Sequence, residues 1–121
     1  MGIKIIDPKV FKALLEVTYH PKMIELALWY AWSFNTPIIT SAYRKNKVWD
    51  GDSGIHMTNP CRAIDWSCEG LTDCYKVTEE INNHWIYDPD RPEKKCAMCH
   101  NVGLGLHIHT QVHDKTIQVS K

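Results

Sequence analysis

The chain has 121 residues and a mass of 14.0 kDa, and 44% of its residues are hydrophobic, so it can build the core of one compact domain. Its 14 basic and 14 acidic side chains give a formal net charge of +0, so nothing in the charge suggests a basic surface for nucleic acids or anionic membranes. We therefore expect one domain over residues 1–121, without a nucleic-acid or membrane partner.

The N-terminal segment lacks the basic region, the continuous apolar run and the small-residue cleavage site of a secretory signal. The chain has 5 cysteines, an odd number that argues against a secreted disulfide framework. We therefore expect a protein that is made in the cytoplasm and whose cysteines are reduced thiols or metal ligands.

Two helices are predicted near the N-terminus. Asp7 can cap a helix that has Pro8 in its first position, and apolar residues recur at helical spacing over residues 8–18. A second helix is predicted over residues 21–34. It has so little polar surface that we expect most of its circumference, including Trp32, to pack in the core.

Strands and one long loop follow these helices. The β-branched run at residues 38–40 predicts a buried strand that leads into the sequence SAYR. Residues 45–60 contain Gly, Asn, Asp and Pro without periodicity, which predicts a loop long enough to be functional. A short strand is predicted over residues 62–66, with Asp65 on one of its faces.

The C-terminal half predicts a helix over residues 71–85, a turn at residues 88–92, and two strands over residues 94–99 and 106–113. Together these elements predict an α+β fold, in which two N-terminal helices pack on a small, mainly antiparallel sheet.

Three side chains in this order suggest a metal site: His56, Asp65 and His109. Two imidazoles and a carboxylate leave zinc an open coordination position for water, which hydrolysis requires and structural support does not. On the last predicted strand, His107 and His109 are two residues apart and so share a face. The sequence therefore predicts metal-assisted hydrolysis, with the metal held at one end of the sheet.

The motifs TSAYR, SGIH, RAIDW and LHIHTQV occur in this order between about residues 36 and 112. In this order they resemble the LAS group of zinc peptidases, which includes the D-Ala-D-Ala carboxypeptidase family and the hedgehog-like fold. The resemblance implies a hedgehog/DD-peptidase-like fold in which His56, Asp65 and His109 bind zinc. It also implies that His107 lies beside the nucleophilic water as a catalytic residue.

The sequence SAYR implies the substrate contacts of this family. Arg44 resembles the arginine that holds a substrate carboxylate or polarises its carbonyl, and Ser41 and Tyr43 are predicted to bind substrate beside it. The substrate class implied is the stem peptide of bacterial peptidoglycan, cleaved by a monomeric carboxypeptidase or endopeptidase. A phage-encoded lysis or virion protein that acts on the cell wall would fit this reading.

Two departures from the family pattern support an alternative. Between His56 and Asp65 lie eight residues, two more than is usual, so the connecting loop must bulge. Leu106 and Gly105 also stand where many members carry a carboxylate. The alternative is a zinc-stabilised, hedgehog-like module that binds a peptide or protein without turnover.

The sequence CAMCH raises a separate question. Cys96 and Cys99 can supply half of a structural zinc site, completed by Cys68, Cys74 or His100. In the plainer interpretation, strand positions simply bury small thiols. The same five residues match a haem attachment string, so a redox or haem protein is a third hypothesis.

Overall fold

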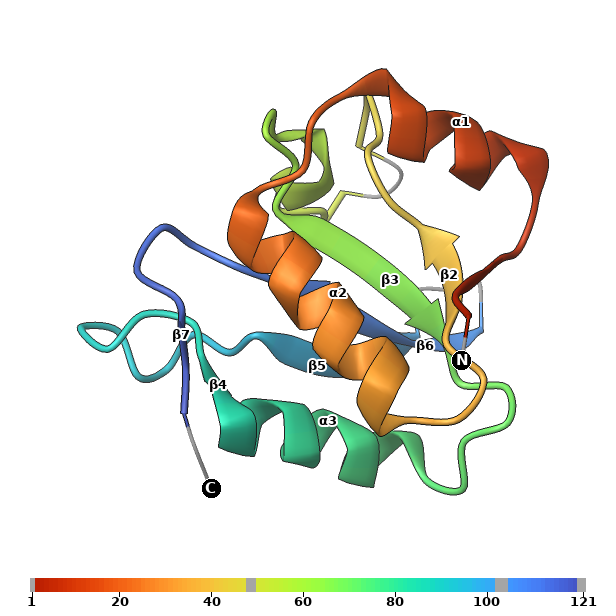
Figure 1. Ribbon diagram of the computed structural model, residues 1–121. Helices are drawn as coiled ribbons and strands as arrows, with labels where there is room; N and C mark the ends of the chain where they lie inside the picture. The colour runs from red at the N-terminus through yellow and green to blue at the C-terminus, as the bar shows by residue number, and fades with distance from the viewer. Residues whose placement is uncertain (1, 48–49, 102–104, 120–121) are drawn as a thin grey trace.

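A five-stranded sheet organises the computed structural model, which describes residues 2–47, 50–101 and 105–119 (Figure 1). The strand order across the sheet is β1 (Lys4–Ile5), β2 (Ile38–Ser41), β3 (Ala63–Ser67), β6 (Leu106–Gln111) and β5 (Ala97–Asn101). Only β1 and β2 pair in parallel, and the other neighbours are antiparallel. The predicted α+β class and the mainly antiparallel sheet are confirmed.

The two N-terminal helices begin where their capping residues predict. Helix α1 (Pro8–Glu16) starts after Asp7, whose carboxylate accepts a hydrogen bond of 3.0 Å from the backbone N–H of Val10. Helix α2 (Pro21–Ser33) starts after His20, whose ring accepts from the N–H of Lys22 at 3.1 Å. Both helices have proline in the first turn, where its missing N–H costs no helical hydrogen bond.

Helix α2 is buried on one side only, contrary to the prediction. Met23, Leu26, Ala27, Tyr30 and Ala31 are buried. The side chains of Ile24, Leu28 and Trp32 lie four residues apart and are 48%, 60% and 79% exposed. The sheet can cover only the side that faces it, so apolar composition alone does not decide which residues of a helix are buried.

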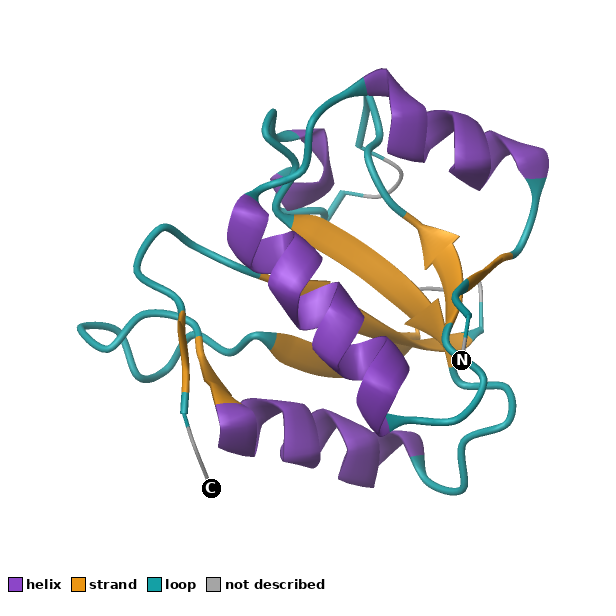
Figure 2. Cartoon of the chain, in the orientation of Figure 1, coloured by secondary structure: helices purple, strands orange, loops and turns teal. Residues whose placement is uncertain are grey.

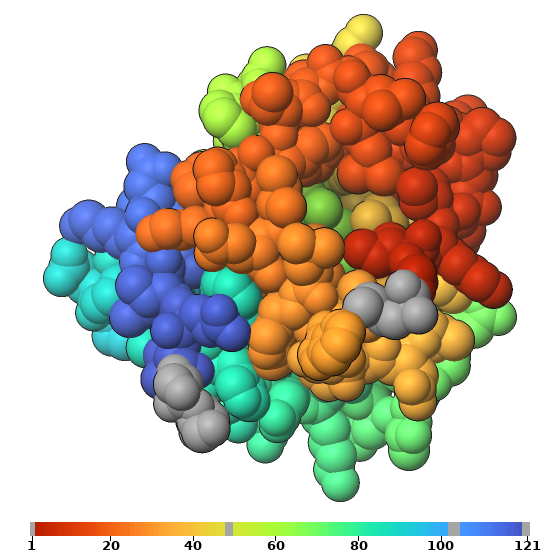
Figure 3. Space-filling model, in the orientation of Figure 1, coloured from red at the N-terminus to blue at the C-terminus, as the bar shows by residue number. Residues whose placement is uncertain are grey.

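Helices α2 and α3 (Cys74–His84) lie across the same face of the sheet (Figure 2). Trp66 of β3 is fully buried there and stacks on Tyr30 of α2, with ring centroids 4.1 Å apart. Its indole N–H donates to Thr110 Oγ1 at 3.0 Å, so the polar atom of this side chain is also satisfied. The space-filling view from the same side shows α2 across this face (Figure 3).

Smaller elements differ from the predictions. Helix α3 begins at Cys74, after a turn in which the N–H of Leu71 donates to the carbonyl of Cys68. Strand β5 begins only at Ala97, because residues 88–94 form consecutive turns. Two paired two-residue strands, β4 (Trp85–Ile86) and β7 (Ile117–Gln118), were not predicted, since so few residues carry no periodicity. Among the described residues, no helix has the length and apolar character needed to cross a membrane.

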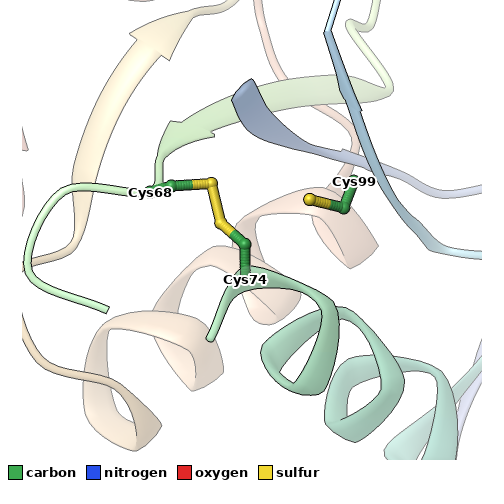
Figure 4. A group of neighbouring side chains, drawn as sticks. All are labelled: Cys68, Cys74 and Cys99. Carbon is green, nitrogen blue, oxygen red and sulfur yellow. A yellow bond between two sulfur atoms is a disulfide. The ribbon is translucent and has the colours of Figure 1, made fainter. Parts of the chain in front are cut away.

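The cysteines also differ from the expectation of wholly reduced thiols. Cys68 and Cys74 form a disulfide with their Cα atoms 5.8 Å apart, whereas Cys61, Cys96 and Cys99 are free (Figure 4). The turn after β3 returns the chain to the start of α3, and this brings the two residues together. The odd total could not reveal such a local pair.

Candidate metal centre

The register of the sheet brings Asp65 and the last two predicted histidines together. Asp65 of β3 lies opposite His109 of β6, and Ser67 lies opposite His107. Because side chains alternate along a strand, these residues face away from Trp66, which is buried beneath the helices. The candidate site therefore lies on the sheet face opposite α2 and α3, at the middle of β3. The expected position at one end of the sheet is wrong.

A loop carries the third member of the group to the same place. His56 belongs to the short 3-10 helix η1 (Ile55–Met57), which follows Gly54 in a left-handed conformation with φ 83°. The backbone N–H of Arg44 donates to the carbonyl of His56 at 2.9 Å and fixes this loop against the end of β2. The long segment between His56 and Asp65 thus leaves the sheet and returns to it, as the predicted bulge requires.

The ligand atoms of the three residues converge. Asp65 Oδ1 lies 3.1 Å from His56 Nε2 and 2.9 Å from His109 Nδ1, and the two nitrogens are 3.3 Å apart. All three side chains are buried. They form one of two groups among the described residues whose atoms lie close enough to share a metal ion.

The outer hydrogen bonds of the two imidazoles decide which atoms face the centre. His56 Nδ1 lies 2.8 Å from the carbonyl of Ala42, which can only accept, so Nδ1 carries the proton. Gln111 Nε2 donates to the carbonyl of Lys95 at 2.8 Å, which orients its Oε1 toward His109 Nε2 at 2.9 Å. His109 Nε2 must therefore donate as well.

In their neutral forms, both imidazoles thus direct a lone pair at the point that Asp65 Oδ1 also faces. Three lone pairs so close together repel one another unless a cation lies between them, either a proton or a metal ion. The partners Ala42 and Gln111 have the role that second-shell groups have around metal-bound histidines, where they fix the tautomer and the ring orientation.

The carboxylate of Asp65 is held in its charged form. Burial by itself raises the pKa of this group, but hydrogen bonds with His109 and His56, and the positive charge that these rings can carry, outweigh burial. The pKa of Asp65 therefore lies below its usual value, and the centre presents a negative charge to a cation.

Two further histidines adjoin the group. His107 Nε2 lies 3.6 Å from Asp65 Oδ2, while His107 Nδ1 lies 3.2 Å from the carbonyl of Gly105. The ring of His100, on the neighbouring strand β5, lies 4.6 Å from that of His107 and 5.7 Å from that of His109. Burial, followed by the charges of these two rings, lowers the pKa of His100. His107 lies beside the centre as predicted, whereas His100 was considered only with the cysteines.

Arg44 occupies a fixed position beside the centre. Its Nη1 donates to Ser41 Oγ at 2.8 Å and lies 3.8 Å from Asp65 Oδ2, and its Nη2 donates to Asp52 Oδ2 at 3.3 Å. Asp52 is buried and was not predicted, because it lies in a loop without a recognisable spacing. These contacts hold the guanidinium group at the wall of the site, where sequence reasoning placed it.

A cleft of about 850 Å³ opens over these residues, within the range of small-molecule and peptide sites. Ser41, Arg44 and His107 line it, and Glu93, Lys94 and Met98 are also among its lining residues. Tyr43 is not part of the described lining, and its backbone N–H instead donates to Tyr19 Oη at 3.1 Å. The binding of substrate by Tyr43 stays a prediction.

Sequence reasoning missed Gln111 as well, although a signal existed. Gln111 follows His109 by two residues on one strand, so its side chain shares the face of the ligands.

Comparison of the chain with known proteins finds no matching family model, no matching curated protein and no matching solved structure.

Proposed function

We propose that this chain is a zinc-dependent hydrolase that cleaves a peptide bond in the stem peptides of bacterial peptidoglycan, as a carboxypeptidase or endopeptidase with a lysis or virion role. The observation that carries the proposal is the convergence of His56 Nε2, Asp65 Oδ1 and His109 Nδ1 on one point. Three protein ligands suit a catalytic zinc better than a structural one, which usually has four.

The residues present fit a zinc ion. Both imidazoles have their outer nitrogens committed as donors and the carboxylate is ionised, so a metal ion can replace the proton that the inner nitrogens and Asp65 share. When bound there, zinc supplies a Lewis acid that activates water near neutral pH and polarises a scissile carbonyl. Two histidines and a carboxylate also bind other first-row ions, so the metal is part of the proposal.

The other side chains around the cleft have distinct tasks in this mechanism. Arg44 lines the cleft beside Asp65 and supplies positive charge for a substrate carboxylate or for the oxyanion that develops during attack. His107 accepts a proton and delivers it to the leaving amine. Glu93 is a carboxylate that lines the cleft and is not one of the three ligands, so it is a second candidate for the base.

The alternative function is a zinc-stabilised module that binds a peptide without cleaving it. It is favoured by Leu106 and Gly105, which supply no carboxylate beside His107. The two functions share the metal site and the cleft, but they differ in turnover. Peptide binding with one metal per chain and no cleavage would select the module.

The first experiment measures metal per chain in protein purified without added metal and without reductant, which leaves the Cys68–Cys74 disulfide intact, beside a His109→Ala variant. We expect one zinc in the parent chain and none in the variant. His113→Ala is the matched control, because His113 lies outside the cleft, where its ring accepts a hydrogen bond from the N–H of Lys115. Zinc retained in His109→Ala would overturn the site and the proposed function with it.

A second experiment tests catalysis. Purified peptidoglycan stem peptides are incubated with the parent chain, His107→Ala and Glu93→Gln, and the products are identified by mass spectrometry. Loss of a general acid or base costs about 10²–10⁴-fold in rate, and we expect this loss for His107→Ala with zinc retained. An unchanged rate would remove His107 from the mechanism, and a loss in Glu93→Gln would assign the base to Glu93.

A further inference from the structure

A second group of potential ligands lies outside the cleft. The sulfur atoms of Cys68, Cys74 and Cys99 are all within 4.8 Å of one another. Figure 4 shows the Cys99 side chain, on strand β5, directed toward the Cys68–Cys74 disulfide. This group differs from the predicted one, since Cys96 is fully buried in the core and does not belong to it.

Three separate elements supply these cysteines. Cys68 directly follows β3, Cys74 is the first residue of α3, and Cys99 lies on β5 opposite Ile108 of β6. Ile108 is fully buried, so Cys99 is on the sheet face that the helices cover. The group is thus on the opposite face from His56, Asp65 and His109.

We propose that Cys68, Cys74 and Cys99 bind a soft divalent metal ion of the zinc type when the chain is reduced, and that the disulfide is the alternative, metal-free state. Thiolates are the preferred ligands of such ions. Zinc–sulfur bonds of about 2.3 Å at tetrahedral angles place the sulfurs ~3.8 Å apart. This spacing is compatible with three sulfur atoms that all lie within 4.8 Å of one another.

The surroundings also suit a bound metal ion. Cys74 is 6% exposed, and Cys68 and Cys99 are half-buried, so the group is sheltered but can be reached from solvent. Cys74 lies in the first turn of an 11-residue helix, where the partial positive charge of the N-terminus favours a thiolate. A metal there would tie the turn after β3, the start of α3 and strand β5 together.

The two states exchange by a balanced reaction. A small disulfide such as oxidised glutathione takes two electrons from the metal-bound thiolates of Cys68 and Cys74, which yields their disulfide and two glutathione thiolates that take up protons from water. The metal then loses two of its three ligands and leaves, and Cys99 remains as a free thiol. A dithiol or phosphine reductant reverses the reaction and restores the site.

Cobalt(II) distinguishes this site from the histidine centre, because only sulfur ligands give a thiolate-to-cobalt charge-transfer band. The chain is reduced with a phosphine, stripped with a chelator and titrated with cobalt(II) in a His56→Ala background, which disables the other site. We expect one cobalt per chain with a charge-transfer band. The band should disappear in Cys99→Ser and in the protein oxidised with glutathione disulfide, and it should persist in Cys61→Ser.

Absence of the band in the reduced chain would overturn the proposal, as would its persistence in Cys99→Ser. Circular dichroism shows whether Cys99→Ser folds, and Cys68→Ser, in the turn after β3, repeats the test if it does not. The result does not depend on the proposed function, because loss of metal from the histidine centre leaves the sulfur band unaffected.

Discussion

The two faces of the sheet carry different kinds of residues and serve different purposes. On the face beneath α2 and α3, Trp66 and Ile108 are fully buried among apolar side chains. On the opposite face, Asp65 and His109 meet imidazole, guanidinium and amide groups. Alternation along five-residue β3 therefore places a core residue and a candidate metal ligand at consecutive positions.

Both faces bury their central residues, but the energetic reason differs. Trp66 gains from removal of a large apolar surface from water. Asp65 is almost as inaccessible, and burying its charge would be costly without partners. Contacts with His56 and His109 compensate for the lost water, so this face is organised by polar partners and ready for a cation.

The largest effect is expected for Asp65→Asn. The amide has nearly the same shape but lacks the charge that a metal requires, so we expect loss of zinc and of hydrolysis down to background. Metal content, measured with the Cys68–Cys74 disulfide intact, and cleavage of stem peptides measure the two effects. Asp88→Asn is the control, because Asp88 is a buried carboxylate paired with Arg91 outside the cleft. Its zinc content should remain at one per chain, and equal loss in both variants would contradict a specific role for Asp65.

Trp66, the residue next to Asp65, should affect the stability of the fold rather than metal binding. Trp66→Ala removes a fully buried side chain, which we expect to lower the free energy of unfolding of the metal-free chain by about 3–5 kcal/mol. Denaturant unfolding measures this loss. Trp32→Ala, whose side chain is 79% exposed, is the matched control, with an expected change within about 0.5 kcal/mol. Similar losses of unfolding free energy in the two variants would contradict the burial of Trp66 and the exposure of Trp32.

Gln111 tests whether the partner of a ligand matters. Gln111→Leu removes the acceptor for His109 Nε2–H, and the loss of such a partner typically lowers metal affinity about 10–100-fold. Gln111→Glu keeps an acceptor there and should retain most of the affinity. Competition with a chelating indicator measures both, and Gln118→Leu on exposed β7 is the control. Equal affinities of Gln111→Leu and the parent chain would show that ring orientation does not depend on this contact.

The sequence predicted the ligand group well because its members belong to periodic or ordered motifs. Asp65 and His109 lie on short strands, where alternation assigns a face, and His56 was found through the order of the motifs. The structure brings the three together. That they bind zinc and support hydrolysis remains a prediction.

Features that depend on contacts between distant segments could not be predicted in the same way. His100 reaches the site only because β5 pairs with β6, and Asp52 only because its loop folds back on Arg44. The Cys68–Cys74 disulfide depends on a turn whose path has no signal in residue spacing. The predicted starts of α1 and α2 were accurate, since capping at Asp7 and proline at the first turn are local effects, whereas α3 starts three residues later than predicted.

The smallest effect concerns the outer side of α2, where the expectation of burial was wrong. Leu28 is 60% exposed, so Leu28→Gln should change the free energy of unfolding by no more than about 0.5 kcal/mol. Leu26 lies two residues away but is fully buried, and Leu26→Gln should cost several times more, because the amide enters an apolar core. Denaturant midpoints of the two variants, measured without metal, give the ratio of their losses in the free energy of unfolding. Comparable losses would mean that the outer side of α2 is covered in solution, and the boundary of the core would then have to include Leu28.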